Sequence, residues 1–458
     1  MLAWNPSCLN AKAIPNVIHK SVLGNAGAAD LQQALPAPKQ GMCKHMSDTG
    51  GCKDEDAGAA QNRFVNHVRY KNSEEKQDQT KELIKDISEF SFSLFSSVNE
   101  PSNNILFSPY SIYSCLSMVY AGTRGETASE MQTALSLNVN QKKLPGASAK
   151  LANMLKSKET EAGGSYEMHL ANGLWLDMDT FVLSDFRHIA ENEYHAAVQS
   201  LDFSKTDLAI NTINDWISGQ TYGKISKILQ EGDVDGSTRV LLTNAVYFKG
   251  SWQKPFDPKA TKTSPFFSSP EASTDVKMME NTSHFSYFEN DSMQMLSLPF
   301  KGKTAENSQL ACLILLPKST QMTDLEKALT VSNIEESISQ LKSQNVHVQL
   351  PKINLKMRME LNPALQALGI KLAFTKDGDF SGIDGMRDLF LSKVIHDTFF
   401  SLDEAGVTAA AATAASINAT AVLEKNPPIE FIANHPFIFL IADLNYKTVL
   451  FMGKFQRP

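Results

Sequence analysis

The first sustained pattern of apolar positions along the chain has the period of an α-helix. In LIKDISEFSFSLFSSV, residues Leu83, Ile87, Phe90 and Leu94 fall on one helical face. The segment SPYSIYSCLSMVYAG begins with a serine and a proline, a pair that favours a helix N-terminus. Residues 207–225 repeat the amphipathic helical pattern. This part of the chain is therefore predicted to be mainly helical.

Later segments carry the shorter, β-branched apolar runs of strands. RVLLTNAVYF (239–248) is almost continuously apolar, as expected for a strand buried on both faces. Similar runs occupy residues 310–317 and 389–404, and residues 427–458 predict two strands around an Asn-Tyr-Lys turn. Because the helices come first and the strands later, the order indicates an α+β fold.

The first 82 residues show no sustained periodicity. They contain Gly and Ala clusters and the polar run YKNSEEKQDQTKE. We expect residues 1–82 to form a disordered N-terminal extension and residues 83–458 to form the folded domain. The acid-free start of the chain, up to Asp30, does not read as a signal peptide, because Lys12 and Pro15 interrupt the apolar run. An organellar-targeting segment and a misassigned start codon stay open.

Composition excludes several classes of function. The chain has 458 residues, is 42% hydrophobic and carries a net charge of -7, so it offers no basic surface for nucleic acid and no polybasic membrane patch. No apolar run is long enough to span a bilayer. The five cysteines do not form a disulfide framework. CKHMSDTGGC, from Cys43 to Cys52, matches no zinc spacing, and we expect no metal and no cofactor.

Motifs of catalysis are absent or imperfect. GQTYGKIS (219–226) has too few residues between its glycines for a phosphate loop and ends a helix instead of following a strand. In GDFSG (378–382) the serine is one place too late for a nucleophile elbow. We therefore expect a protein that is not an enzyme.

One stretch near the end of the chain is unusual for a globular protein. DEAGVTAAAATAASINATAVLEKNPP (403–428) has a centre made of Ala, Thr and a single Val. Its alanines favour a helix, whereas its threonines favour a strand. On its own, the stretch is typical of an alanine-rich linker or helix, and its flanks decide between these alternatives.

Those flanks resemble the serpin superfamily of serine protease inhibitors. The resemblance rests on four segments in the right order: NILFSPYSIYSCLSMVYAGTRGET, LTNAVYFKGSWQKPFD, FLSKVIHDTFFSLDEAG and ANHPFIFLIADLNYKTVLFMGKF. It covers the chain from about residue 83 to its end. It implies a fold of three β-sheets with eight to nine helices and an exposed reactive loop.

The resemblance also implies a mechanism. The protein would act as a suicide substrate: a target protease cleaves the loop, the loop inserts into the central sheet as an extra strand, and the protease is carried to the far pole as a covalent acyl-enzyme. The implied partner is a serine protease, and the implied state is a monomer in the extracellular space, with the cytoplasm as the alternative. Inhibition of a cysteine protease by the same trap, or a non-inhibitory carrier or chaperone role, stays possible.

Small side chains suit a segment that must be stable first in water and then between two strands. Large side chains would clash on insertion, and charges would be buried without partners. Gly406 supplies backbone freedom at the hinge. The implied loop hinge consists of Glu404, Gly406, Val407, Thr408, Ala409, Ala410, Ala411, Ala412 and Thr413.

Other positions match family sites beneath and at the end of the sheet. The implied shutter, where the sheet must part, consists of Ser108, Ser111, Asn244 and His396. Trp252 matches the tryptophan of the breach, where the loop first enters. Considered without the family, each is an ordinary buried polar or aromatic residue, and that interpretation is compatible with the implied role.

In this family the residue before the cleaved bond is usually the seventeenth, when the hinge glutamate is counted as the first. Counting from Glu404 gives Thr420, so the implied cleaved bond is Thr420-Ala421. A small residue there suits elastase-like or subtilisin-like proteases. Because the following stretch is longer than in most members of the family, Leu423 (for a chymotrypsin-like target) and Lys425 (for a trypsin-like target) are alternatives.

Glycosylation and polyanion binding are two further questions that the sequence raises. Asn281, Asn290 and Asn418 lie in glycosylation sequons, and a glycan at Asn418 would block protease docking. Lys142 and Lys143 are the nearest approach to a glycosaminoglycan site, and a solvated surface is the preferred interpretation.

Overall fold

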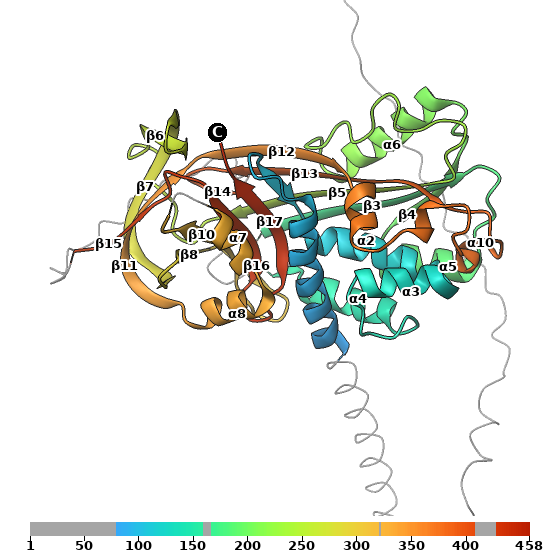
Figure 1. The fold of residues 1–458 in the computed structure, drawn as a ribbon, viewed down its shortest axis with the longest axis horizontal. Coiled ribbons are helices and arrows are strands. Elements are labelled where there is room, and N and C mark those ends of the chain that lie inside the picture. Colours follow the sequence, from blue (N-terminus) through green and yellow to red (C-terminus); the bar gives the residue numbers. More distant parts are fainter. Residues whose placement is uncertain (1–78, 159–165, 320–321, 408–426) are drawn as a thin grey trace, which may run out of the picture. The chain divides into compact units, whose positions relative to one another are not determined.

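The computed structural model describes residues 79–158, 166–319, 322–407 and 427–458 (Figure 1). All of these belong to the second of the chain's two compact units, residues 66–458. A helix covers residues 79–98, and Thr80 in its first described turn is 2% exposed. Residues 79–82, which the sequence placed in the disordered extension, are therefore helical. The division of the chain at residue 82 otherwise stays a prediction.

The described helices are mostly those that the apolar patterns predict. Excluding the four-residue α10, the described residues hold nine α-helices, which agrees with the expected eight to nine. The helices after 79–98 are α2 (Pro109–Gly122), α3 (Gly125–Ala134), α4 (Leu144–Met154), α5 (Ser184–His188), α6 (Thr206–Gln220), α7 (Thr323–Ala328), α8 (Val331–Ser339), α9 (Asn362–Ala367) and α10 (Ser381–Asp384), with the short π-helix η1 (Ile189–Glu193) and 3-10 helix η2 (Leu372–Phe374).

The strands of the described residues form three sheets, as expected. The six-stranded sheet has the order β12 (Ile353–Glu360), β13 (Leu391–Leu402), β14 (Gly406–Val407), β5 (Val240–Ser251), β3 (Tyr166–Asp177), β4 (Ala197–Leu201). The nine-stranded sheet has the order β1 (Ile105–Phe107), β17 (Val449–Phe455), β16 (Phe437–Asp443), β10 (Leu310–Pro317), β8 (Met293–Pro299), β7 (Ala272–Glu289), β11 (Lys342–Pro351), β15 (Ile429–Ile432), and β6 (Lys262–Ser269) pairs with β7. The two-stranded sheet consists of β2 (Ser157–Lys158) and β9 (Lys303–Thr304).

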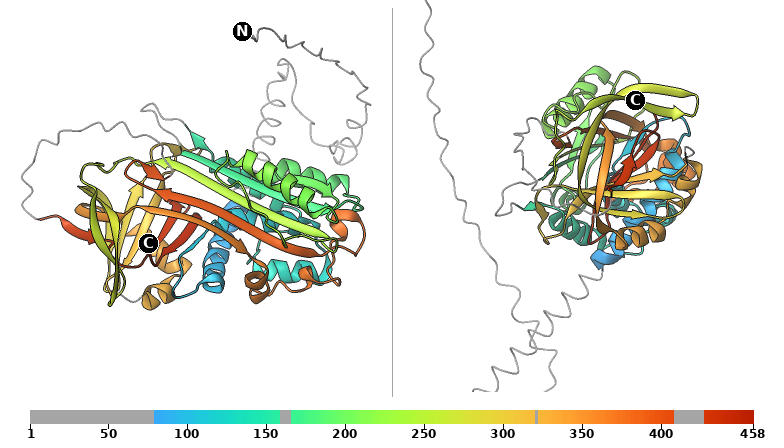
Figure 2. Two further views of the ribbon diagram at one scale, coloured as in Figure 1. Left: turned by 90° about the horizontal axis from the view of Figure 1, so that it is seen from above. Right: turned by 90° about the vertical axis from the view of Figure 1, so that its left-hand side faces the viewer.

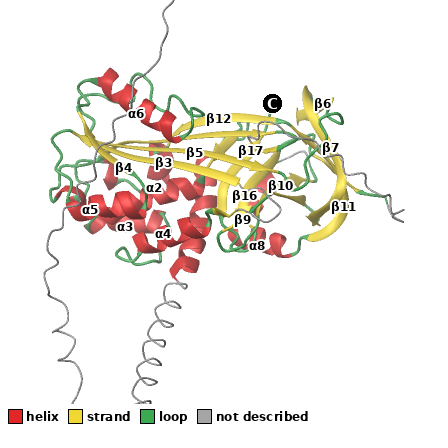
Figure 3. Ribbon diagram, turned by 180° about the vertical axis from the view of Figure 1, so that it is seen from behind, coloured by secondary structure: helices red, strands yellow, loops and turns green. Residues whose placement is uncertain are grey.

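The six-stranded sheet is covered on both faces. Helix α6 lies on one face, and α2 lies on the other (Figures 1 and 3). Alternate residues of β5 supply two separate cores: Leu242 and Val246 face the α2 side, whereas Leu241 and Ala245 face the α6 side. Burial on both faces explains why the segment 239–248 is apolar almost without interruption.

The local sequence sets the start of α2. Ser108 is the N-cap, its hydroxyl accepts from the backbone N–H of Ser111 at 3.2 Å, and Pro109 occupies the first helical position. The expected serine-proline start is therefore confirmed. This start fixes the N-terminus of α2 directly beneath β5 and β13, which run side by side along the sheet (Figure 2).

Candidate functional site: the seam between β5 and β13

The predicted loop hinge begins with a tight turn between β13 and β14. The backbone N–H of Asp403 donates to the carbonyl of Gly406 at 2.9 Å, and the Asp403 carboxylate accepts from the N–H of Ala405 at 2.9 Å. Gly406 has φ +151°, and a Cβ at this position would lie 2.0 Å from the carbonyl oxygen of Gly250. The turn therefore requires glycine, both for its backbone conformation and for its close approach to β5.

The two residues of β14 lie between β13 and β5. Val407 is the register partner of Gly250 on β5 and of Leu402 on β13. Its side chain is fully buried in the core on the α2 side. Below this point β13 pairs directly and in parallel with β5, from Leu391 to Phe399. The seam is thus occupied by the hinge at one end and closed along the rest of its length.

Trp252 holds the hinge against the end of β5. Its backbone N–H donates to the carbonyl of Ala405 at 2.9 Å, and its indole Nε1–H donates to the carbonyl of Asp403 at 2.9 Å. The ring is 1% exposed and stacks on Phe300 with centroids 4.8 Å apart. The structure therefore brings the breach tryptophan together with the hinge residues.

Glu404 anchors the turn from the other side. Its carboxylate is 2.6 Å from the Lys352 ammonium and accepts from the Thr261 hydroxyl at 2.7 Å, while its carbonyl accepts from the Phe256 N–H at 2.9 Å. Burial alone would raise its pKa, but the hydrogen bonds from Lys352 and Thr261 outweigh burial and lower the pKa below its usual range. The carboxylate is therefore held in its charged form.

The four shutter residues meet in one hydrogen-bonded cluster under the closed part of the seam. The N–H of Ser108 donates to His396 Nε2 at 3.1 Å, and His396 Nδ1 lies 2.6 Å from Asn244 Oδ1. The Asn244 amide donates to the hydroxyl of Ser111 at 2.6 Å. The bond between His396 and Asn244 crosses from β13 to β5, so it spans the seam itself.

These partners fix the protonation of His396. Its Nε2 faces an N–H donor and must carry a lone pair, so Nδ1 carries the proton and donates to Asn244. The imidazole is completely buried, and burial lowers its pKa to about 3. His396 is thus a neutral imidazole whose tautomer is set by the cluster.

Two residues of this region were missed by the sequence analysis. Asn172 on β3 is the register partner of Asn244 and accepts from its amide at 2.5 Å, so three neighbouring strands each place a polar residue at the same level. Asp397 is completely buried on the α6 side of β13, and neither of its carboxylate oxygens has a hydrogen-bond partner in the described region. Burial raises its pKa to about 7, although Lys356 and Arg358 lower it in part.

The remaining site predictions lie elsewhere. Hinge residues Thr408, Ala409, Ala410, Ala411, Ala412 and Thr413, the bond Thr420-Ala421, its alternatives Leu423 and Lys425, and the sequon at Asn418 fall outside the described residues. The Asn290 side chain is exposed, and that of Asn281 donates to the carbonyl of Pro255 at 3.1 Å. Lys142 and Lys143 are exposed.

Two other kinds of site are absent from the described residues. Within the residues that the structure places, no group of His, Cys, Asp and Glu side chains is arranged to hold a metal ion. None of the helices among them is long and apolar enough to cross a membrane.

Comparisons with known proteins identify the family. The serpin (serine protease inhibitor) family profile matches residues 85–458, and the chain belongs to this family. Leukocyte elastase inhibitor from Equus caballus is 36% identical over 81% of this chain and 97% of its own length.

Solved structures of serpins have the same fold as this chain. Serpin48 of the insect Tenebrio molitor, described as highly specific, superposes with a TM-score of 0.73 at 30% identity, covering 82% of this chain and 98% of its own. Human thyroxine-binding globulin, solved with thyroxine, gives a TM-score of 0.75 at 25% identity, covering 83% and 99%. The family is described as serine protease inhibitors, and both solved structures are similar to this chain over more than four-fifths of its length.

Proposed function

We propose that this protein inhibits a serine protease as a suicide substrate whose cleaved loop inserts between β5 and β13. The observation that supports this most strongly is β14. Gly406 and Val407 pair with β5, and Val407 also pairs with β13, so β14 lies where the proposed insertion would begin. The proposed insertion extends this pairing along the seam.

The register of β14 predicts where each following residue would lie. Continued without a bulge, it places Thr413 opposite both Asn244 on β5 and His396 on β13. An inserting strand must break the hydrogen bond between those two side chains, since it crosses the seam. A hydroxyl both donates and accepts, so Thr413 can satisfy His396 Nδ1–H and the Asn244 carbonyl in turn. This gives a physical reason for a threonine within the alanine run.

The same register separates the two faces of the proposed strand. Residues Ala409, Ala411 and Ala415 would share the face of Val407, opposite the buried Phe248, Val246 and Leu242 of β5. That core is already filled. Apart from Thr413, which would meet the polar cluster on this face, methyl side chains are therefore the largest that we expect it to accept without displacing neighbours.

The chemistry of the trap requires no group from the inhibitor other than the peptide bond. The protease serine oxygen attacks the carbonyl carbon of Thr420, and the amine of Ala421 leaves with a proton as the C–N bond breaks. An ester then joins Thr420 to the protease. Insertion carries this ester along the sheet, roughly 35 Å for the length of β5, before water can hydrolyse it.

The target class follows from the residue before the bond. Thr420 favours proteases with a small apolar pocket, and the relationship to leukocyte elastase inhibitor supports an elastase-like target. Leu423 would instead favour a chymotrypsin-like protease and Lys425 a trypsin-like one. A cysteine protease caught by the same insertion is a further alternative, and the extracellular location, like the cytoplasmic one, stays a prediction.

A ligand-carrying role is the second candidate. The similarity to thyroxine-binding globulin favours it, because the same fold there holds a small molecule. A carrier does not need the loop to insert after cleavage. The inhibitory and the ligand-carrying function therefore predict different outcomes after the loop is cleaved.

The experiment is to mix the full chain with elastase, subtilisin, chymotrypsin and trypsin. Denaturing electrophoresis then detects a covalent complex, and mass spectrometry weighs the released C-terminal peptide. We expect a stable complex with elastase or subtilisin and a peptide that begins at Ala421. Loop cleavage without any complex would contradict the proposal. Thr420→Arg should move inhibition toward trypsin, and no such change would place the bond elsewhere.

A further inference from the structure

Asn290 lies at the turn between β7 and β8 and begins the sequon Asn-Asp-Ser. Its side chain is exposed. Its Oδ1 accepts three hydrogen bonds, from the backbone N–H of Ser292 at 3.0 Å, the hydroxyl of Ser292 at 3.0 Å and the backbone N–H of Met293 at 2.9 Å. Because three donors meet at the oxygen, the orientation of the amide is fixed. No described residue accepts a hydrogen bond from its Nδ2.

The other sequon within the described residues is arranged differently. Asn281 lies inside β7, where its register partner is Val348 of β11, and it is only partly exposed. Its Nδ2 donates to the carbonyl of Pro255 at 3.1 Å. The nitrogen to which a sugar would be joined is therefore already bound to the protein in Asn281, whereas in Asn290 it faces solvent.

Asn290 also lines a cavity of about 460 Å³ between the β7–β8 turn and helices α7 and α8, which Figure 1 shows beside β8 and β10. Small-ligand sites have volumes of roughly 300–1,000 Å³. We define the hairpin groove by its apolar residues Phe288, Leu329 and Ile334 and its polar residues Glu336 and Gln340. Leu329 and Ile334 are buried, whereas Glu336 and Gln340 are exposed at the rim.

This combination of surfaces suits a sugar. An N-acetylhexosamine has apolar C–H faces and an acetyl methyl group, which would cover the apolar residues of the groove. Its hydroxyl and amide groups would reach the carboxylate of Glu336 and the amide of Gln340. A sugar joined to Asn290 is tethered at the edge of the groove, so even a weak contact is occupied because the effective concentration is high.

We propose that Asn290 is a site of N-linked glycosylation and that the hairpin groove binds the first N-acetylhexosamine of its glycan. In the modification, Nδ2 attacks C1 of the sugar of an oligosaccharide joined through diphosphate to a lipid. The bond from C1 to the diphosphate oxygen breaks, the lipid diphosphate leaves, and the nitrogen loses one proton. The donor and its transferase belong to the secretory pathway, so the proposal goes with the extracellular location. It does not rest on the inhibitory function.

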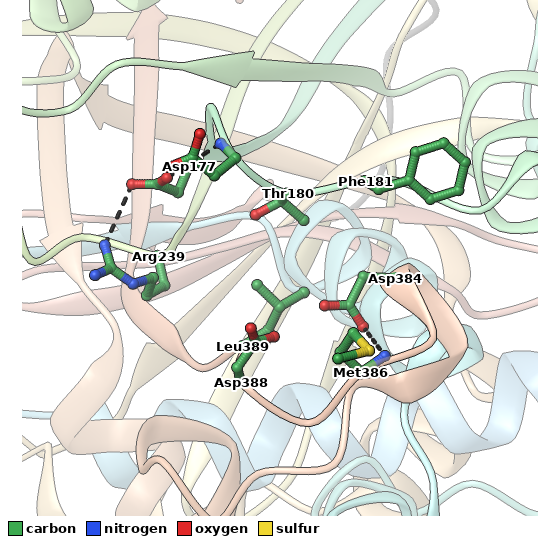
Figure 4. Close-up of a pocket in the computed structure, with 9 residues that line it drawn as sticks. Asp177, Thr180, Phe181, Arg239, Asp384, Met386, Asp388 and Leu389 are labelled. Atoms are coloured by element: carbon green, nitrogen blue, oxygen red, sulfur yellow. Dashed lines mark hydrogen bonds and ion pairs between the residues drawn. The ribbon is translucent and has the colours of Figure 1, made fainter.

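A second cavity, of about 260 Å³, supplies a matched control (Figure 4). Asp177 pairs with Arg239 at 3.2 Å in its wall. Met178 is 57% exposed and precedes Asp179 and Thr180, so Met178→Asn creates an Asn-Asp-Thr sequon beside this cavity. A glycan at that position would have nearly the same local sequence but would meet a wall rich in carboxylates. The wall is lined by Asp177, Asp179, Asp384, Asp388 and Arg239, together with Phe181 and Met386.

The site is tested by secreting the full chain from cultured animal cells behind a cleavable signal. A glycosidase that converts each modified asparagine to aspartate, followed by peptide mass spectrometry, locates every glycan. We expect a glycan at Asn290 and none at Asn281. The mass shift should be lost in Asn290→Gln and retained in Asn281→Gln.

The groove is tested by the rate at which an endoglycosidase that cuts after the first sugar trims the folded chain. We expect the glycan of Asn290 to be trimmed several times more slowly than that of Met178→Asn, because its core is covered. Glu336→Ala with Gln340→Ala should raise the rate about fivefold, as expected for the loss of two hydrogen bonds. The urea-unfolded wild type is a second reference, and unfolding midpoints establish that each variant is folded.

Each half of the proposal has an outcome that overturns it. A secreted chain that carries no glycan at Asn290, or one modified at Asn281 instead, would overturn the site. Trimming at Asn290 that is as fast in the folded as in the unfolded chain would overturn the groove. The covalent complex with a protease can be measured on the same samples, so failure of this proposal is distinguishable from failure of the proposed inhibitory function.

Discussion

The two ends of the seam between β5 and β13 are built from the same strands, but the strands find their hydrogen-bonding partners in different ways. Near Gly250 and Leu402, β14 lies between the strands and supplies their missing partner. From Leu391 to Phe399, β13 pairs directly with β5. The sheet therefore accommodates both an inserted and a closed arrangement within one molecule.

What differs between the two regions is how they are held. At the hinge the loop is fixed by backbone hydrogen bonds to Trp252 and by the ion pair of Glu404 with Lys352. In the closed region the strands are joined by their parallel backbone pairing and, in addition, by the side-chain bond between His396 and Asn244. The comparison teaches that opening the seam further breaks both this backbone pairing and a defined side-chain contact, and the inserting strand has to replace both.

The largest effect is expected from Val407→Arg at the inserted end. The side chain of Val407 is fully buried, and an unpaired charge there would cost several kcal/mol. The variant should be cleaved by the target protease as a substrate, with complex formation reduced more than tenfold. Gel electrophoresis of the reaction measures the ratio of complex to cleaved chain. Val407→Ala is the control, and a normal yield of complex from Val407→Arg would show that this hinge register is wrong.

At the closed end of the seam, His396 and Asp397 should change the pH dependence of folding stability in opposite directions. The pKa of His396 is lowered to about 3, so the unfolded chain binds the additional proton below about pH 6.5 and this residue costs stability as pH falls. The pKa of Asp397 is raised to about 7, so the native chain binds the additional proton between about pH 7 and 4, and this residue adds stability as pH falls.

Single variants should separate these two effects. From pH 7 to pH 4, the free energy of unfolding of Asp397→Asn should fall by about 3 kcal/mol relative to the wild type, and that of His396→Gln should rise by a similar amount relative to the wild type. Urea unfolding across this range measures both. Parallel pH profiles in the two variants would contradict the assigned protonation states.

Gly406→Ala sharpens the comparison by removing β14 without introducing a charge. Because a Cβ would collide with the carbonyl of Gly250, the variant should lose about 1–3 kcal/mol or release the hinge from the seam. Release would free the indole of Trp252 from Asp403 and change its fluorescence. Gly219→Ala, where a Cβ meets no atom within 4 Å, is the control. Identical spectra and stability in both variants would argue against the observed turn.

The smallest effect is expected from Glu404→Gln. The substitution removes the charge that pairs with Lys352, which is partly exposed, so the loss should be about 1 kcal/mol. The lowered pKa of Glu404 means that its contribution is present above about pH 4.5 and disappears as pH falls further. The difference in unfolding free energy between variant and wild type should therefore vanish in acid. A constant difference would assign the effect to packing.

The sequence was a good guide to residues that lie in distinctive local patterns. The serine-proline start of α2 and the nearly continuous apolar run of β5 each have a local physical cause, and the structure places them as predicted. The shutter residues were assigned through family resemblance, and their cluster exists. Its role in opening the sheet stays a prediction.

The sequence could not predict features that depend on strand register. Asn172 joins the polar cluster only because β3 lies beside β5 in one particular alignment, and nothing near it in the chain indicates this. Asp397 looks like an ordinary polar residue until its burial is known. Met386 and Phe181 come together only at the end of the folded sheet. Knowing which residues are neighbours across strands requires the assembled sheet.

The most direct test of the central claim is the unfolding temperature of the chain before and after its loop is cut. If the cut loop inserts between β5 and β13, it adds a strand of backbone hydrogen bonds to the sheet, each worth about 0.5–1.5 kcal/mol. The midpoint of thermal unfolding should then rise by about 10 °C or more after cleavage. A midpoint that stays the same or falls after cleavage would contradict insertion and, with it, the proposed mechanism.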